Sequence, residues 1–155
     1  MSHITQIEWN PNLTTQIFCL QSSGDTQIID LGKKKVENIN IVISAKSKPT
    51  VVRCHPKRPD IVAYGLENGH IYFLNLRSKE TYIFDACDTA ARKRSKLEEN
   101  PPFTVSEIAL LSEQELMRNV SLDMKEVRIL EMRWDPNEDN LLVSFGDKSM
   151  ALITF

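Results

Sequence analysis

The 155-residue sequence has little of what secreted, membrane-spanning or metal-binding chains carry. Its three cysteines, Cys19, Cys54 and Cys87, are odd in number and show no C-x-x-C spacing, so they suggest neither a disulfide framework nor a zinc site. No run approaches the ~18–20 apolar residues of a membrane helix, and no apolar signal segment opens the chain. The formal net charge is only −2. We therefore expect a cytoplasmic protein, with the nucleus as a second location, and no membrane partner.

Catalytic patterns are also missing. The histidines His3, His55 and His70 are scattered, and no Ser, Cys or carboxylate has a spacing that strand geometry would bring into a triad with them. Gly65 and Gly69 flank a hairpin rather than a strand-to-helix turn, so neither belongs to a phosphate-binding loop. The sequence predicts a protein that is not an enzyme, with no cofactor, no metal site and no small-molecule substrate.

What the sequence does have is a stretch of four apolar runs separated by turn signals. The runs cover residues 51–54, 61–64, 71–76 and 81–84. Asn68-Gly69 separates the second and third runs, and both residues tolerate the positive φ of a tight hairpin turn. Four short strands bury too little apolar surface to offset the entropy of ordering the chain. This unit must therefore pack on copies of itself or on another layer.

Copies are present. Residues 7–31 align with residues 52–76 without a gap, and residues 132–155 form a third copy. The first strand of each copy ends in a tripeptide with proline at its third position: Trp9-Asn10-Pro11, Cys54-His55-Pro56 and Trp134-Asp135-Pro136. The alignment predicts that Trp9, Cys54 and Trp134 occupy equivalent strand positions in the core, although an exposed tryptophan would serve instead as a ligand platform.

The repeated pattern resembles that of the WD-repeat family, whose repeats each build one blade of a β-propeller. The resemblance rests on the aromatic-x-Pro tripeptide, the hairpin at residues 64–70 and the apolar run that ends at Leu74-Asn75. Leu74-Asn75 and Ile29-Asp30 stand where the family has Trp-Asp, and the family's Gly-His pair is missing from every repeat. The resemblance covers roughly residues 2–84 and 127–155. It implies an all-β fold, a partial β-propeller of about three WD-type blades.

We expect a single domain with one interruption. Blade one covers about residues 2–45, with an outer strand at 37–44, and blade two covers about 50–84. The segment 85–126 lacks an aromatic-x-Pro and a Gly-bearing hairpin, which favours an insertion over a degenerate fourth repeat. A capping box at residues 112–115 predicts a short helix there, over 112–119.

The third blade, residues 127–155, is expected to lack its outer strand, because the sequence stops after the third apolar run. Three blades do not close a propeller ring. We therefore expect the chain to belong to a longer protein or to take its remaining blades from elsewhere.

Two functional classes remain. The first is a non-catalytic scaffold that mediates protein interactions within a larger assembly, with partner proteins or the remaining propeller blades as its partners; it predicts an exposed apolar or aromatic cluster on the blade loops. The second is an RNA-binding propeller segment. The repeat pair at residues 9–11 and 54–69 is similar to WD-repeat proteins that deliver small nuclear RNA for spliceosomal snRNP assembly. Large WD-repeat scaffolds with a helical repeat region match about as well.

RNA binding by a nearly neutral protein needs a local basic surface, because phosphate neutralisation and counterion release supply most of the affinity. The candidate contacts to RNA or to a partner are Lys33, Lys34, Lys35, Lys57, Arg58, Arg92, Lys93 and Arg94. Strand order puts the first five in loops at the same end of the blades. The cluster at 92–94 lies in the insertion, as a solvated loop, a nuclear-import patch or a phosphate-contacting patch.

Overall fold

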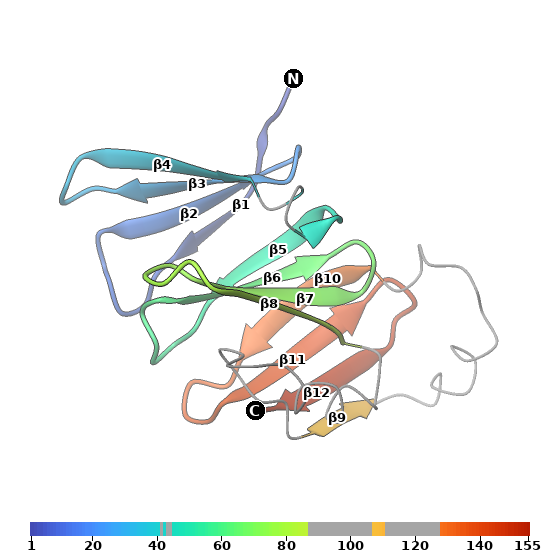
Figure 1. Ribbon diagram of the computed structural model, residues 1–155. Coiled ribbons are helices and arrows are strands. Elements are labelled where there is room, and N and C mark those ends of the chain that lie inside the picture. The colour runs from blue at the N-terminus through green and yellow to red at the C-terminus, as the bar shows by residue number, and fades with distance from the viewer. Residues whose placement is uncertain (41, 43–44, 87–106, 111–127) are drawn as a thin grey trace.

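A computed structural model describes residues 1–40, 42, 45–86, 107–110 and 128–155, and the strands in these ranges form three antiparallel sheets (Figure 1). Sheet 1 contains β1 (Ile4–Trp9), β2 (Gln16–Gln21), β3 (Asp25–Asp30) and β4 (Lys35–Asn40) in that order. Sheet 2 contains β5 (Pro49–Cys54), β6 (Ile61–Leu66), β7 (His70–Asn75) and β8 (Thr81–Asp85). Sheet 3 has the order β10 (Ile129–Trp134), β11 (Asn140–Phe145), β12 (Met150–Thr154) and β9 (Glu107–Leu110).

The sheets stack face to face, with sheet 2 in the middle and the first strands β1, β5 and β10 side by side (Figure 1). The predicted repeat register is confirmed. Trp9, Cys54 and Trp134 each end the first strand of their sheet, and they pair with Ile17, Val62 and Leu141 at the start of the second strand. Each first strand also has a register irregularity near its beginning. The three sheets are thus copies of one unit.

The hairpin between β6 and β7 has the turn that the sequence predicts. Gly69 has a φ of 82°, and the side-chain oxygen of Asn68 accepts a hydrogen bond from the backbone N–H of His70 at 3.1 Å. A left-handed residue at this place matches the twist of the two strands. The Asn-Gly pair therefore fixes the register between β6 and β7.

Two apolar clusters hold the stack together, one between each pair of neighbouring sheets. The cluster between sheets 1 and 2 includes Phe18, Leu20, Ile28, Val52, Cys54, Val62, Tyr64 and Leu74. The cluster between sheets 2 and 3 includes Val51, Ile61, Ala63, Ile71, Phe73, Met132, Leu141, Val143 and Ile153. Successive residues of a strand point to opposite faces, so β5, β6 and β7 contribute to both clusters. Burial on both faces explains why the runs of sheet 2 are continuously apolar.

The prediction that Trp9 is a core residue is wrong. Its exposed fraction is 54%, whereas Cys54 is 4% exposed and Trp134 packs against the cluster between sheets 2 and 3. All three side chains lie on the face of their sheet that is turned toward the preceding sheet. Within the described residues no sheet precedes sheet 1. Trp9 therefore keeps its predicted strand position but not the burial predicted for it.

Sheet 3 has an outer strand, which corrects the expectation that this strand is absent. β9 pairs antiparallel with β12, and Ile108 lies opposite Ile153. The strand belongs to the segment predicted as an insertion. Four residues that precede β10, without a hairpin to β12, carry no local pattern that identifies them as a strand. Without β9, the edge of β12 would have backbone groups without hydrogen-bond partners, and pairing with residues 107–110 satisfies these groups.

Two further predictions lie partly or wholly outside the described residues. The short helix at 112–119 lies wholly outside them. The outer strand predicted at 37–44 is present as β4 but runs over Lys35–Asn40, and Val42 is helical, so the strand ends before the predicted residue 44.

Candidate interaction surfaces

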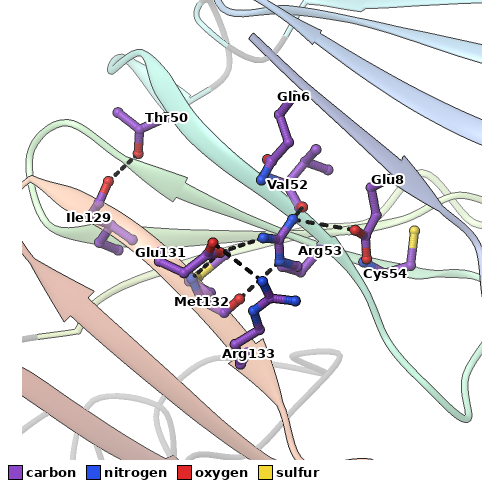
Figure 2. A network of polar contacts seen from close by, with 10 residues as sticks. All are labelled: Gln6, Glu8, Thr50, Val52, Arg53, Cys54, Ile129, Glu131, Met132 and Arg133. Carbon is purple, nitrogen blue, oxygen red and sulfur yellow. Dashed lines mark hydrogen bonds and ion pairs between the residues drawn. The ribbon is translucent and has the colours of Figure 1, made fainter.

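Arg53 lies in a network of polar contacts at the inner edge where the three first strands meet (Figure 2). Its Nη1 lies 3.3 Å from Glu8 Oε2 on β1, and its Nη2 lies 2.5 Å from Glu131 Oε1 on β10. Its Nε and Nη1 donate to the backbone carbonyls of Met132 and Val52, both at 3.0 Å. Arg53 is only 8% exposed. One guanidinium thus links sheets 1, 2 and 3.

Other side chains satisfy the backbone groups of the neighbouring first strand. Gln6 Oε1 accepts a hydrogen bond from the backbone N–H of Val52 at 2.7 Å, and Thr50 Oγ1 donates to the carbonyl of Ile129 at 2.5 Å. Backbone groups on the edge of a sheet need partners when they are removed from water. Here each sheet supplies these partners to the first strand of the next one.

Glu8 is held in a partly buried setting. Burial raises the pKa of its carboxyl, while the Arg53 charge and a hydrogen bond from the backbone N–H of Cys54 act in the opposite direction. The carboxylate has its contacts on the adjoining sheet. Glu8 therefore connects sheet 1 to sheet 2.

A second polar group centres on His55, which is 1% exposed. Its Nδ1 accepts hydrogen bonds from the backbone N–H groups of Lys57 and Arg58, both at 3.0 Å. Nε2 therefore carries the proton, and it lies 3.0 Å from Asp139 Oδ1 on the neighbouring sheet. The ring packs against Trp134 with centroids 4.5 Å apart. Burial lowers the pKa of His55, and the hydrogen bond to Asp139 opposes that shift.

The residue before proline has the same role in all three repeats. Asn10 Oδ1 and Asp135 Oδ1 accept from backbone N–H groups two residues further on, at 3.0 and 2.8 Å, as the His55 ring does. The first turn also reaches sheet 2, since Asn10 Nδ2 donates to the carbonyl of Pro59 and Asn12 Nδ2 to that of His55, both at 3.0 Å. These turns therefore connect successive sheets, and the alignment of Asn10, His55 and Asp135 is the signal for them in the sequence.

The structure places the predicted basic residues in two different settings. Lys33, Lys34 and Lys35 lie exposed in and after the turn between β3 and β4. Lys57 Nζ donates to the carbonyl of Asn137, and Arg58 Nη2 lies 2.9 Å from Asp139 Oδ2, so both make contacts to sheet 3. Arg92, Lys93 and Arg94 lie outside the described residues.

Sequence reasoning missed two exposed leucines beside the lysines. Leu13 and Leu31 have exposed fractions of 44% and 54%. Their turns are adjacent, because the backbone N–H of Leu31 donates to the carbonyl of Thr15 at 2.8 Å. We name this region the turn surface; its residues are Leu13, Leu31, Lys33, Lys34 and Lys35. Its only signal in the sequence is an apolar residue inside a turn segment.

The described ranges hold no group of three or more His, Cys, Asp or Glu side chains placed to bind a metal ion. In the same ranges, no helix has the length and apolar content needed to span a bilayer.

Three repeated antiparallel sheets, stacked through their faces with their first strands at one edge, define the chain as a partial β-propeller. Solved WD-repeat propellers match it. A chain of the mitotic checkpoint complex superposes with a TM-score of 0.61 at 10% sequence identity, covering 99% of this chain and 37% of that one. The C-terminal WD40 domain of Sif2 superposes with a TM-score of 0.54 at 7% identity, covering 98% of this chain and 34% of that one. The chain thus spans about a third of the length of each of these two chains, and at these identities the likeness establishes the fold.

No protein-family model matches the sequence, and a search of curated proteins found no match.

Proposed function

We propose that this chain is a non-catalytic scaffold that binds partner proteins within a larger assembly, through the turn surface. The observation that carries the proposal is the pair of exposed leucines on adjacent turns, Leu13 and Leu31. An apolar centre with a charged rim is the composition of many protein-binding sites. The neighbouring lysines favour a partner segment with apolar and acidic side chains.

Rigidity of the turns supports the proposal. Asn10 and Asn12 connect the turn between β1 and β2 to sheet 2 through hydrogen bonds. The turn between β3 and β4 is in turn hydrogen-bonded to the turn between β1 and β2, from Leu31 to Thr15. A surface that is already ordered loses less conformational entropy when a partner binds. The fold therefore presents these leucines in a fixed arrangement.

The test compares proteins crosslinked to the chain in cells that express it. For a variant with Leu13→Asp and Leu31→Asp, the amount of specific partner protein that is recovered should fall about tenfold or more, because two charges replace the apolar centre. Leu130→Asp is the matched control, since Leu130 is 53% exposed on β10 in sheet 3. If the double variant and the control recover the same proteins as the wild type, the turn surface is not the binding site.

RNA binding is the second candidate, and the run of exposed lysines at 33–35 supports it. Recognition of small nuclear RNA would place phosphates against this run, so affinity for a uridine-rich RNA fragment should fall steeply with salt. Changing all three lysines to Glu should then abolish binding, whereas the Leu13 and Leu31 variant should retain it. Lys57 and Arg58 are poorer targets, because charge reversal there also removes contacts to sheet 3. Salt-insensitive or absent binding would exclude this candidate.

A further inference from the structure

One face of sheet 1 carries a row of apolar side chains that runs across all four strands. Trp9 lies opposite Ile17, Ile17 opposite Ile29, and Ile29 opposite Val36. Trp9 and Val36 are 54% and 55% exposed, and Ile7, two residues before Trp9 on the same face, is 59% exposed. We name these five residues the open face of sheet 1.

The equivalent rows of the other two sheets are buried at their inner positions, whereas Thr81, the counterpart of Val36 at the outer end of the row in sheet 2, is exposed as Val36 is. In sheet 2 the row begins Cys54, Val62, Leu74, with exposed fractions of 4%, 0% and 5%; in sheet 3 it includes Leu141 and Ile153, both 0% exposed. Each of these rows is covered by the outward face of the sheet that precedes it. The face that carries this row is therefore an interface in sheets 2 and 3, whereas it is exposed in sheet 1.

Sheet 3 supplies a matching outward face. Arg133, Leu142 and Leu152 form a row on the side of sheet 3 that is turned away from sheet 2. Leu142 and the nearby Met150 are 38% and 41% exposed.

The polar end of that row also matches the interface between sheets 2 and 3. Arg133 stands one residue before Trp134, as Arg53 stands one residue before Cys54. Arg53 donates to the carbonyl of Met132, and the residue at the position of Met132 in β1 is Ile7. An outward face of sheet 3 stacked on sheet 1 would thus bring an arginine to the carbonyl of Ile7.

We infer that the open face of sheet 1 binds the outward face of sheet 3 in a second copy of the chain, so that copies associate head to tail. The contact repeats the register of the two interfaces within the chain. It covers Trp9 and Ile7, and it gives the edge of β1 the arginine that the edge of β10 already has. A symmetric contact between two sheets 1 would bury the apolar rows but would bring no arginine to β1. This surface adjoins the turn surface at Leu31, because Leu31 stands at the position of Leu76 and Phe155, which pack against the clusters between sheets. The inference does not depend on the partner proposed for the turn surface.

A pair of complementary variants tests the inference. Trp9→Arg blocks the open face of sheet 1 and leaves sheet 3 intact, whereas Leu142→Arg blocks the outward face of sheet 3 and leaves sheet 1 intact. By sedimentation velocity at tens of micromolar, the wild type should form species of two or more copies and each variant should be monomeric. An equimolar mixture of the variants should form a 1:1 dimer, because one intact contact remains between them. This rescue separates a head-to-tail contact from any other mode of association.

Ile83→Arg is the matched control, because Ile83 is 39% exposed on β8 of the middle sheet. It should assemble as the wild type does, and circular dichroism should show folded strands in all variants. A monomeric wild type would overturn the inference, and so would a mixture that stays monomeric. Association that survives in Leu142→Arg would also overturn it, since the contact would then be symmetric through sheet 1.

Discussion

At the scale of single residues, the buried polar side chains of Arg53 and His55 join one sheet to the next. Arg53 is buried with its guanidinium nitrogens on carboxylates and carbonyls of β1, β5 and β10. A buried charge is tolerated only when its hydrogen bonds are made. Arg53 therefore requires sheets 1, 2 and 3 to be in place together.

Replacement of Arg53 by Met should destabilise the fold by about 2–3 kcal/mol. Loss of one partner of a fully buried ion pair costs about 3–5 kcal/mol, and the value is lower here because the Glu8 and Glu131 side chains are 22% and 41% exposed. Urea unfolding measures the change. Arg77→Met is the control, because the Arg77 side chain is 82% exposed and its ion pair with Asp60 lies at the surface. Equal stabilities of the two variants would show that Arg53 does not hold the sheets together.

His55 should make the stability of the fold depend on pH. Its pKa is lowered in the folded state, so the unfolded chain binds more protons as the pH falls below about 6.5, and the free energy of unfolding decreases by up to about 1.4 kcal/mol per pH unit. Above that pH the contribution is complete. Chemical unfolding at a series of pH values from 7.5 to 5 measures the slope.

His55→Asn isolates this effect. Asparagine can accept the turn hydrogen bonds as Asn10 does, but it does not titrate. The variant should lose the component of the slope that His55 contributes, whereas Glu8 titrates in both proteins. An identical pH dependence in the two proteins would show that His55 is not the group responsible.

At the scale of elements, close approach between sheets depends on Gly65 in β6. A Cβ at this position would lie 2.5 Å from Ile129 Cγ2 and 2.6 Å from Val51 Cγ1. Both neighbours are buried and belong to the cluster between sheets 2 and 3. Glycine is needed here for space.

Gly65→Ala should therefore destabilise the protein by about 1–3 kcal/mol, since two packed side chains must move. Thermal unfolding followed by circular dichroism measures the effect. Gly32→Ala provides the comparison, because the nearest atom to its added Cβ would be 3.4 Å away, and its stability should stay within about 0.5 kcal/mol of the wild type. A neutral Gly65→Ala would mean that sheets 2 and 3 are less closely packed than described.

β9 should protect the outer edge of sheet 3. Proline at both Ile108 and Ala109 removes backbone donors and is poorly compatible with a paired strand. In hydrogen exchange the amides of β12 that lose their partners should then exchange at least about tenfold faster, while the amides shared between β10 and β11 keep their protection. Ile108→Val with Ala109→Ser is the control, because it retains both donors. Unchanged protection of β12 in the proline variant would argue against the pairing with β9.

At the scale of the whole molecule, sheet 2 is the structural centre because it is buried on both faces. Every residue of β6 is buried, whereas Val36 on β4 is 55% exposed. Local opening costs most free energy where buried contacts are densest. Native-state hydrogen exchange should therefore find the slowest amides in β6 and β7 and faster ones in β4. Protection of β4 equal to that of β6 would contradict this order.

The sequence by itself determined the strands of the three repeats other than β9, their hairpins and the repeat register. Alternation and turn residues are local properties of the chain, and a one-residue slip would turn every core side chain outward. This is why Trp9, Cys54 and Trp134 are found at equivalent positions. The sequence also contained the Asn10, His55 and Asp135 alignment, although it did not show which sheets these side chains connect.

Only the tertiary structure decided burial, strand recruitment and the contacts between sheets. Trp9 has the strand position of Trp134 but not its neighbours, so its exposure follows from what stacks on sheet 1 and not from local sequence. β9 becomes a strand because the edge of β12 offers hydrogen bonds to it. Arg53 and His55 find their partners about 80 residues away, at Glu131 and Asp139. Contacts of this kind depend on the stacking of whole sheets, which no local pattern in the sequence encodes.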